Sequence, residues 1–317
     1  MKTLSLLLLC ALLTACAASS EGDLPIATVQ PTLPAGIVTD ESGTPTLEVY
    51  VTEDETISAM DIESYVMGVV AGEMKNDWPL EALKAQAILA RTFVVRFVSE
   101  KESRYEGADI STDIAEAQAY SEANINERIR QAVEETSGQV LVTAAGTLPY
   151  TWFHAHSGGM TALAREGLGW KDAEPSHTLV TKGLDSPDAP AEAREWSADF
   201  SAADFLAACR KVGADPQSIN EISVYEKGGS GRAVTLMVDG EKVPAAELRI
   251  ALGSTVMRST LLTELSSNGT SVHMEGRGYG HGVGMPQWGA YALAQDGLTG
   301  EDIALHYYSG LRIVKMW

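Results

Sequence analysis

A glycine-rich segment near the C-terminus constrains the fold of this chain more than any other feature. Six glycines lie between Gly276 and Gly289, in the run GRGYGHGVGMPQWGAYALAQDG, which continues into a helical pattern. Glycine tolerates positive φ angles and lets the backbone approach a ligand, so this density predicts a backbone-lined site. A flexible spacer would not carry the side chains that interrupt these glycines. They are Arg277, Tyr279, His281, Gln287 and Trp288. The alternative is a set of tight turns that leads into a packed helix.

The N-terminus has the pattern of a secretory signal. Lys2 precedes an apolar stretch that ends in small residues and Cys16, and this stretch is too short to span a membrane. The ending Leu-Thr-Ala-Cys resembles a bacterial lipobox, in which cleavage precedes a lipidated cysteine. We therefore expect residues 1–16 to be a lipoprotein signal peptide and Cys16 to be the lipid-bearing N-terminus that anchors a secreted envelope protein to a membrane. The alternative is an ordinary signal peptide with an incidental cysteine.

Composition limits the rest of the chain to one large domain and excludes some partners. Residues 17–45 are polar and acidic and predict a flexible tether, which leaves residues 46–317 for the folded domain. The net charge of −20 argues against nucleic acid, because phosphates would be repelled. If Cys16 is lipidated, Cys209 has no partner for a disulfide, and its helical surroundings predict a small buried side chain.

Hydrophobic patterning predicts an α+β fold with mostly antiparallel strands, which allows two lobes around a groove. A strand pair at 46–60 leads into a helix capped by Asp61 and ended by Glu73, and a longer helix follows Pro79. We expect a hairpin over 139–156 and a final strand at 311–317 that needs a partner. The middle region predicts a helix near 201–212, strands at 221–239 and a helix near 244–252, without regular βαβ alternation.

Three sets of residues are candidates for chemistry. Glu73 ends an apolar helix and precedes Trp78, so a partly desolvated carboxyl could serve as a general acid. A solvated helix end is the alternative. Lys84 and Arg91 are seven residues apart, hence on nearly the same helix face, and could flank an anionic sugar or lie exposed. His154 and His156 could form a zinc pair on one strand face, although no third ligand is evident. The Ser157-Gly158-Gly159 turn lacks the frame of a serine-hydrolase nucleophile.

With these residues in view, the chain resembles the stage II sporulation protein D family, also called the SpoIID or amidase-enhancer (LytB) domain family. Three blocks in order carry the resemblance across most of residues 46–317. They are IESYVMGVVAGEMKNDWPLEALKAQAILARTF, then FHAHSGGMT followed by Trp170, then GRGYGHGVGMPQWGAYALAQDG with HYYSG.

The resemblance implies a peptidoglycan lytic transglycosylase that cuts glycan strands, preferably those without stem peptides. Glu73 would be the catalytic acid and then base, with Lys84 and Arg91 assisting, and no cofactor. We expect the other blocks to contribute substrate-binding residues. They are Ser157, Gly158, Gly159, Arg277, His281, Gln287, Trp288 and Tyr308. A single carboxylate suffices, because the attacking hydroxyl belongs to the substrate.

The resemblance also allows a second function, and this chain differs from some family members at two positions. The alternative is a non-catalytic amidase enhancer that binds glycan and stimulates a partner cell-wall amidase; a purely structural wall-binding lipoprotein is a third reading. Some family members bind zinc through two cysteines just before a Gln-x-Tyr motif, which here is Gln118-Ala119-Tyr120. The matching positions are Ser111 and Ala117, so we expect no structural zinc there.

Overall fold

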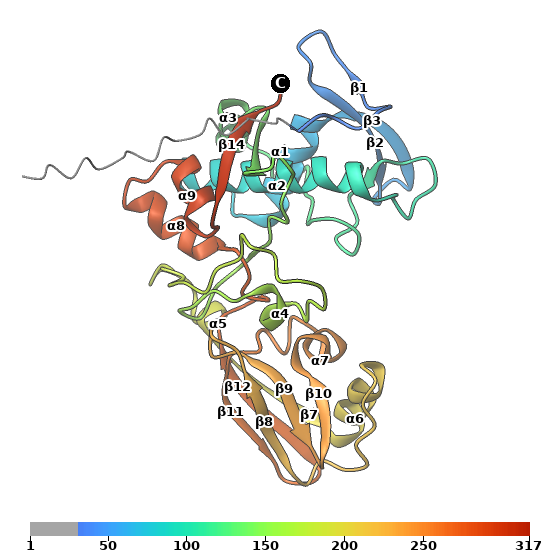
Figure 1. Cartoon of the computed structure of the whole chain (residues 1–317), viewed down its shortest axis with the longest axis vertical. Coiled ribbons are helices and arrows are strands. Elements are labelled where there is room, and N and C mark those ends of the chain that lie inside the picture. Colours follow the sequence, from blue (N-terminus) through green and yellow to red (C-terminus); the bar gives the residue numbers. More distant parts are fainter. Residues whose placement is uncertain (1–30) are drawn as a thin grey trace, which may run out of the picture.

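A computed structural model describes residues 31–317 and shows an α+β fold, as the sequence predicts. Two lobes with separate hydrophobic cores lie one above the other and are joined by irregular segments (Figure 1). The predicted signal peptide, Cys16 and the first part of the tether lie outside the described residues. Within residues 31–317, no helix is long and apolar enough to cross a bilayer.

The first lobe is built around helix α2, which is buried along most of its length. A small sheet in the order β1-β2-β3, with β4 beside β2, covers part of this lobe. The predicted strand pair and the helices on either side of Trp78 are confirmed. The elements are β1 (Val38–Thr39), β2 (Pro45–Val51), β3 (Thr56–Asp61), α1 (Ile62–Glu73), α2 (Leu80–Glu100), β4 (Ile110–Ser111), α3 (Glu127–Glu135) and β5 (Gln139–Thr143).

The end of the chain returns to the first lobe and completes its core. Helices α8 and α9 pack against α2, and β14 pairs antiparallel with β5. These elements are β13 (Met285–Pro286), α8 (Gln287–Gln295), α9 (Gly300–His306) and β14 (Leu311–Lys315). The partner that the final strand needs is therefore β5. The hairpin predicted over 139–156 is wrong, because β6 (Phe153–His154) pairs in parallel with β13 instead.

The second lobe contains two three-stranded antiparallel sheets and two main helices. The sheets have the orders β10-β9-β8 and β11-β12-β7. The helices predicted near 201–212 and 244–252 are confirmed as α6 and α7. The elements from the junction onward are α4 (Ala164–Gly167), α5 (Ala191–Arg194), β7 (Glu195–Ser201), α6 (Ala202–Lys211), β8 (Ile222–Lys227), β9 (Ala233–Val238), β10 (Glu241–Pro244), α7 (Ala245–Leu252), β11 (Leu262–Ser267) and β12 (Ser271–Arg277).

Two local features refine the expectations from sequence. Val38 and Thr39 pair with the start of β2, so regular structure begins before the predicted end of the tether at residue 45. Cys209 is buried in the core of the second lobe, and burial raises the pKa of its thiol to about 11. A thiol in this setting behaves as a small apolar side chain.

Candidate functional site

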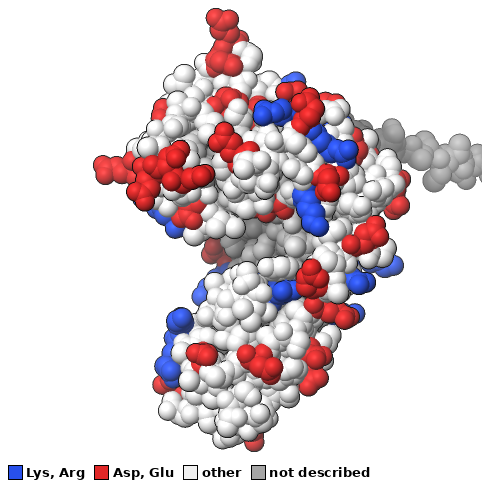
Figure 2. All heavy atoms as spheres, turned by 180° about the vertical axis from the view of Figure 1, so that it is seen from behind, with Lys and Arg blue, Asp and Glu red and all other residues white. Residues whose placement is uncertain are grey.

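Glu73 is the last residue of α1 and borders two hollows, which we together call the groove. Each hollow has a volume of about 450 Å³, and Glu73 lines both. The first is formed by the residues that follow α1, with Asn124 opposite. The second extends to the junction between the lobes and is lined by Trp152, Phe153, His154, Tyr279 and His281, among others. Figure 2 shows a hollow between the two lobes. A linear polymer could therefore pass Glu73 on both sides.

Two glycines of α1 bring a neighbouring segment against the helix end. A Cβ at Gly68 would lie 2.1 Å from the ring of Tyr120, and one at Gly72 would lie 2.6 Å from the backbone of Ala119. Because both positions lack a side chain, residues 119 and 120 pack directly on α1. This contact places the Ala119 backbone N–H 2.8 Å from Glu73 Oε1, to which it donates a hydrogen bond.

The surroundings of Glu73 favour its protonated form. Burial raises the pKa of this carboxyl, and the hydrogen bonds from Ala119 and Gln287 only partly oppose that effect. Gln287 Nε2 lies 3.1 Å from the Glu73 carbonyl oxygen and 3.5 Å from Oε2. The C-terminal end of a helix also carries partial negative charge, which disfavours a carboxylate there. A carboxyl with a raised pKa is suited to donate a proton at neutral pH.

One wall of the second hollow contains β6, which is held in place by its pairing with β13. At Gly284 φ is +70°, and a Cβ there would lie 2.0 Å from the Trp152 carbonyl oxygen. The glycine run is therefore required for this close approach, as its density predicts. His154 and His281 lie on this wall with ring centroids 5.6 Å apart.

Both histidines of this wall are held neutral. Burial lowers the pKa of His154 well below its usual value, and the nearby His281 and Arg232 add to the effect. Burial likewise lowers the pKa of His281 to about 3, with further lowering by Arg249 and Arg232. His281 Nδ1 accepts a hydrogen bond from the Val283 N–H at 3.0 Å. Neutral rings can exchange hydrogen bonds with hydroxyl groups and contribute no positive charge next to Glu73.

The expectation that Lys84 and Arg91 flank the groove is not what the structure shows. Arg91 is fully buried, and its guanidinium forms an ion pair with Glu63 at 2.5 Å. Lys84 forms ion pairs with Glu81 at 2.7 Å and Glu135 at 2.6 Å. A seven-residue spacing places both on one helix face, but that face packs inside the first lobe. Both side chains therefore hold helices together, and Arg91 is inaccessible to a substrate.

The Ser157-Gly158-Gly159 turn lies at a different cavity from Glu73. Ser157 is fully buried, and its hydroxyl and backbone N–H both donate to Asp185. Gly158 and Gly159 have positive φ angles and line a hollow of about 560 Å³ with His156, Lys182 and Arg194, among others. The structure therefore does not bring this turn together with Glu73.

The remaining predicted binding residues divide between the groove and other places. Gln287 contacts Glu73, and Trp288 packs beside it against Trp78 with ring centroids 4.6 Å apart. Tyr308 is buried, and its hydroxyl donates to the Trp152 carbonyl oxygen, so it supports the wall from behind. Arg277 is exposed at the end of β12 in the second lobe, and neither hollow beside Glu73 includes it.

The structure does not bring His154 and His156 together as the zinc pair that their spacing allows. His154 lines the groove beside Glu73, whereas His156 lines the cavity at the Ser157 turn. The strand ends at His154, so the alternation that would place both rings on one face does not continue. At the two positions that the family resemblance matched to zinc-binding cysteines, Ser111 is buried in β4 and Ala117 lines the groove.

Sequence reasoning missed three contributors to the groove. The Ala119 N–H could not be found, because a backbone donor leaves no residue signature. Gln118 is buried beneath the groove, with no hydrogen-bond partner for its amide among the described residues. Lys75 lines the first hollow with its ammonium group 5.9 Å from the centre of the Trp288 ring, and it is a nearby cation where Lys84 was expected. Its place two residues after Glu73 was the available signal.

Comparisons with known proteins identify the family of this chain. The family model described as stage II sporulation protein matches residues 50–142, which include Glu73. Stage II sporulation protein D of Bacillus amyloliquefaciens is 31% identical over 282 residues, which cover 84% of this chain and 77% of that protein. The protein of the same name from Bacillus subtilis is 30% identical over 282 residues, 84% of this chain and 78% of its own length. The chain belongs to the stage II sporulation protein D family.

Two further matches concern the second lobe and the breadth of the family. A model described as a domain of unknown function (DUF8618) matches residues 162–284, which include the sheets of the second lobe. The protein named amidase enhancer of Bacillus subtilis is 27% identical over 296 residues, 78% of this chain but only 40% of that protein. Membership of this family supports a function related to the cell wall and a location in the cell envelope.

Proposed function

We propose that this SpoIID-family chain is a peptidoglycan lytic transglycosylase with Glu73 as its catalytic residue. One observation carries the proposal: a partly buried carboxyl with a raised pKa lines both hollows of the groove. The substrate class is the glycan strand, whose chain of sugar rings could occupy both hollows at once. Strands without stem peptides would fit the groove with fewer steric demands.

In the proposed mechanism Glu73 acts first as an acid and then as a base. The protonated carboxyl donates its proton to the oxygen between C1 of N-acetylmuramic acid and N-acetylglucosamine, and the C1–O bond breaks. The resulting carboxylate accepts the proton of the C6 hydroxyl as that oxygen bonds to C1. The products are a 1,6-anhydromuramic end and a new N-acetylglucosamine end. No water is consumed, so no second carboxylate is required.

The groove supplies partners for both charge states of Glu73. The Ala119 N–H and the Gln287 amide both donate towards the carboxyl oxygens and would stabilise the carboxylate that forms after proton transfer. Burial opposes that charge in the resting state. The raised pKa favours the acid that gives the proton, and the two donors favour the carboxylate that takes one back.

The decisive experiment compares wild type with Glu73→Gln on denuded glycan strands. We expect wild type to yield 1,6-anhydromuramic ends, detected by mass spectrometry, and the variant to lose about 10²- to 10⁴-fold in rate. The exposed Asp77 also lines the first hollow. If it activated water, the products would carry reducing muramic ends, and that result would reject the transglycosylase.

A second candidate function is supported by the relative named amidase enhancer. In that case the groove would bind glycan without cutting it, and the chain would stimulate a cell-wall amidase. Absence of anhydro ends from wild type, together with increased activity of an added amidase, would favour this function. A Glu73→Gln variant that still stimulates the amidase would separate the two activities.

We also propose that Cys16 carries a lipid that holds the chain at a membrane facing the wall. The support is the lipobox-like sequence and the polar stretch that follows it. Metabolic labelling with a fatty-acid analogue tests this directly: label should enter the wild-type chain and be absent from Cys16→Ala. Equal labelling of both chains would refute the anchor.

A further inference from the structure

The outer face of the sheet β11-β12-β7 gathers one histidine and three carboxylates. His273 and Glu275 are two residues apart on β12 and therefore share a face. Glu264 on β11 is the direct cross-strand partner of Glu275, and Asp199 on β7 is the direct partner of His273. The other face of β12 carries Val272 and Met274, which are buried in the core of the second lobe.

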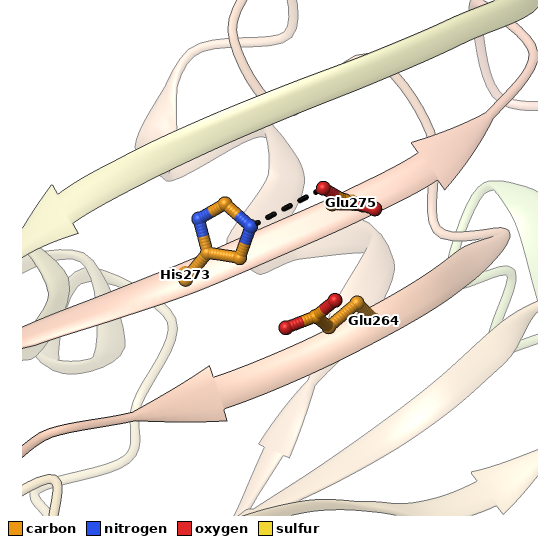
Figure 3. A group of neighbouring side chains, drawn as sticks. All are labelled: Glu264, His273 and Glu275. Carbon is orange, nitrogen blue, oxygen red and sulfur yellow. Dashed lines mark ion pairs between the residues drawn. The ribbon is translucent and has the colours of Figure 1, made fainter.

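The side chains of Glu264, His273 and Glu275 converge above the sheet (Figure 3). Each offers one ligand atom, and these three atoms lie within 4.8 Å of one another. His273 Nε2 lies 3.5 Å from Glu275 Oε1. Zinc holds nitrogen and oxygen ligands at about 2.0–2.2 Å, so two of its ligands lie at most about 4.4 Å apart, and small side-chain rotations would bring the three atoms to one ion. The side chains of His273 and Glu275 are 31% and 47% exposed, so an ion could enter from solvent.

Asp199 stands outside this triad and orients its histidine. His273 Nδ1 lies 2.8 Å from Asp199 Oδ1, so this nitrogen carries the proton that the carboxylate accepts. In the neutral ring the lone pair is then on Nε2, the nitrogen that faces Glu275. Histidines that bind metals commonly donate their other ring N–H to a carboxylate in this way, which fixes the tautomer and the direction of the ring.

The pairing of Glu264 with Glu275 carries a cost that a bound cation would remove. Like charges directly opposite each other on neighbouring strands destabilise a sheet. Within residues 31–317, neither carboxylate forms an ion pair with a lysine or arginine within 4.0 Å. The carboxylate of Asp199, which lies beside His273 Nδ1, adds to the negative charge that a cation would meet there.

We propose that Glu264, His273 and Glu275 form a zinc-binding site, with Asp199 as the residue that positions His273. One imidazole nitrogen and two carboxylate oxygens suit Zn²⁺, which completes its coordination with water. Binding displaces any proton on Nε2 into solvent. The ion would tie β11 to β12 on the exposed face of the second lobe, apart from the Glu73 groove and from the positions of Ser111 and Ala117.

The test is calorimetric titration of the full chain, freed of metal by a chelator, with zinc chloride. We expect one zinc per chain, with affinity at least tenfold weaker in His273→Ala and in the double variant Glu264→Gln/Glu275→Gln. Asp199→Asn should weaken binding by about tenfold or more, because it no longer fixes the ring. The matched control is His306→Ala, an exposed histidine in α9, which should bind as wild type does.

Thermal unfolding keeps the test independent of any activity. Zinc should raise the Tm of wild type and of His306→Ala, and should leave the Tm of His273→Ala unchanged. Without zinc all three chains should unfold alike, since the replaced side chains are partly exposed. Unchanged zinc affinity in His273→Ala would overturn the site, as would no binding to wild type. The site would also be overturned if wild type bound calcium as tightly as zinc and His273→Ala bound calcium with the same affinity.

Discussion

Helix α1 carries a glutamate at each end, and the two have opposite surroundings. Glu63, in the first turn, accepts hydrogen bonds from the guanidinium of Arg91, the Gly138 N–H and the Trp317 indole. Glu73, at the last residue, receives the Ala119 N–H and the Gln287 amide, and no lysine or arginine of residues 31–317 pairs with it within 4.0 Å.

The comparison shows how one residue type serves structure at one end and chemistry at the other. At Glu63, the positive end of the helix dipole and the buried guanidinium of Arg91 both lie close to the carboxyl group. The negative end of the dipole and burial without a cation favour a neutral carboxyl at Glu73. The Glu63 carboxyl is therefore engaged by a cation and two N–H donors, whereas the Glu73 carboxyl has N–H donors but no cation.

The largest effect on stability should come from breaking the ion pair of Glu63 at the N-terminal end of α1. Arg91→Met leaves Glu63 without its buried cation, so the free energy of unfolding should fall by about 3–5 kcal/mol. Urea denaturation followed by circular dichroism measures this. The double variant Arg91→Met/Glu63→Met should recover part of the loss, because no lone charge remains buried. A loss below about 1 kcal/mol would show that this ion pair does not stabilise the lobe.

Replacing Glu73, at the C-terminal end of α1, should not destabilise the fold at neutral pH. The pKa of Glu73 is raised in the folded state, so the folded protein binds more protons and its stability falls as pH rises through that pKa. The cost is about 1.4 kcal/mol for each unit of displacement. At neutral pH Glu73→Gln should therefore be at least as stable as wild type, with a flatter stability–pH curve. A destabilised Glu73→Gln would contradict the assigned environment.

Gln287→Ala should have a smaller effect, on the pKa of Glu73. Its amide lowers the pKa of Glu73, so its removal should raise that pKa further. If Glu73 must start protonated, the alkaline limb of the rate–pH profile for anhydro-end formation should move to higher pH by less than about one unit. Gln131→Ala, an exposed amide on α3, provides the control. Movement to lower pH would argue against this role.

Lys84→Ala should have the smallest effect. Its ion pairs with Glu81 and Glu135 lie near the surface, so the loss in unfolding free energy should stay below about 1 kcal/mol. Anhydro-end formation should equal that of wild type, because the side chain is engaged away from the groove. A large drop in rate with unchanged stability would restore the sequence-based expectation that Lys84 assists the site.

Local sequence patterns were sufficient to predict most individual helices and strands, but not which strands pair with each other. Periodicity and capping predicted α1, α2, α6 and α7, and placed Glu73 at a helix end. The pairing of β5 with β14 joins residues about 170 positions apart, and no local signal distinguishes that partner from the expected hairpin. The spacing of Lys84 and Arg91 correctly placed both on one face, but could not show that this face points into the protein.

By itself, the sequence determined the elements, the glycines that allow close backbone contact, and the candidate acid at residue 73. These follow from interactions between near neighbours, which a pattern of residues encodes directly. Only the tertiary structure decided that Glu63 is paired and Glu73 is not, that the Ala119 N–H reaches the carboxyl, and that Glu264 meets His273. Those outcomes depend on burial and on contacts between distant segments, and such contacts set the charge and reactivity of a side chain.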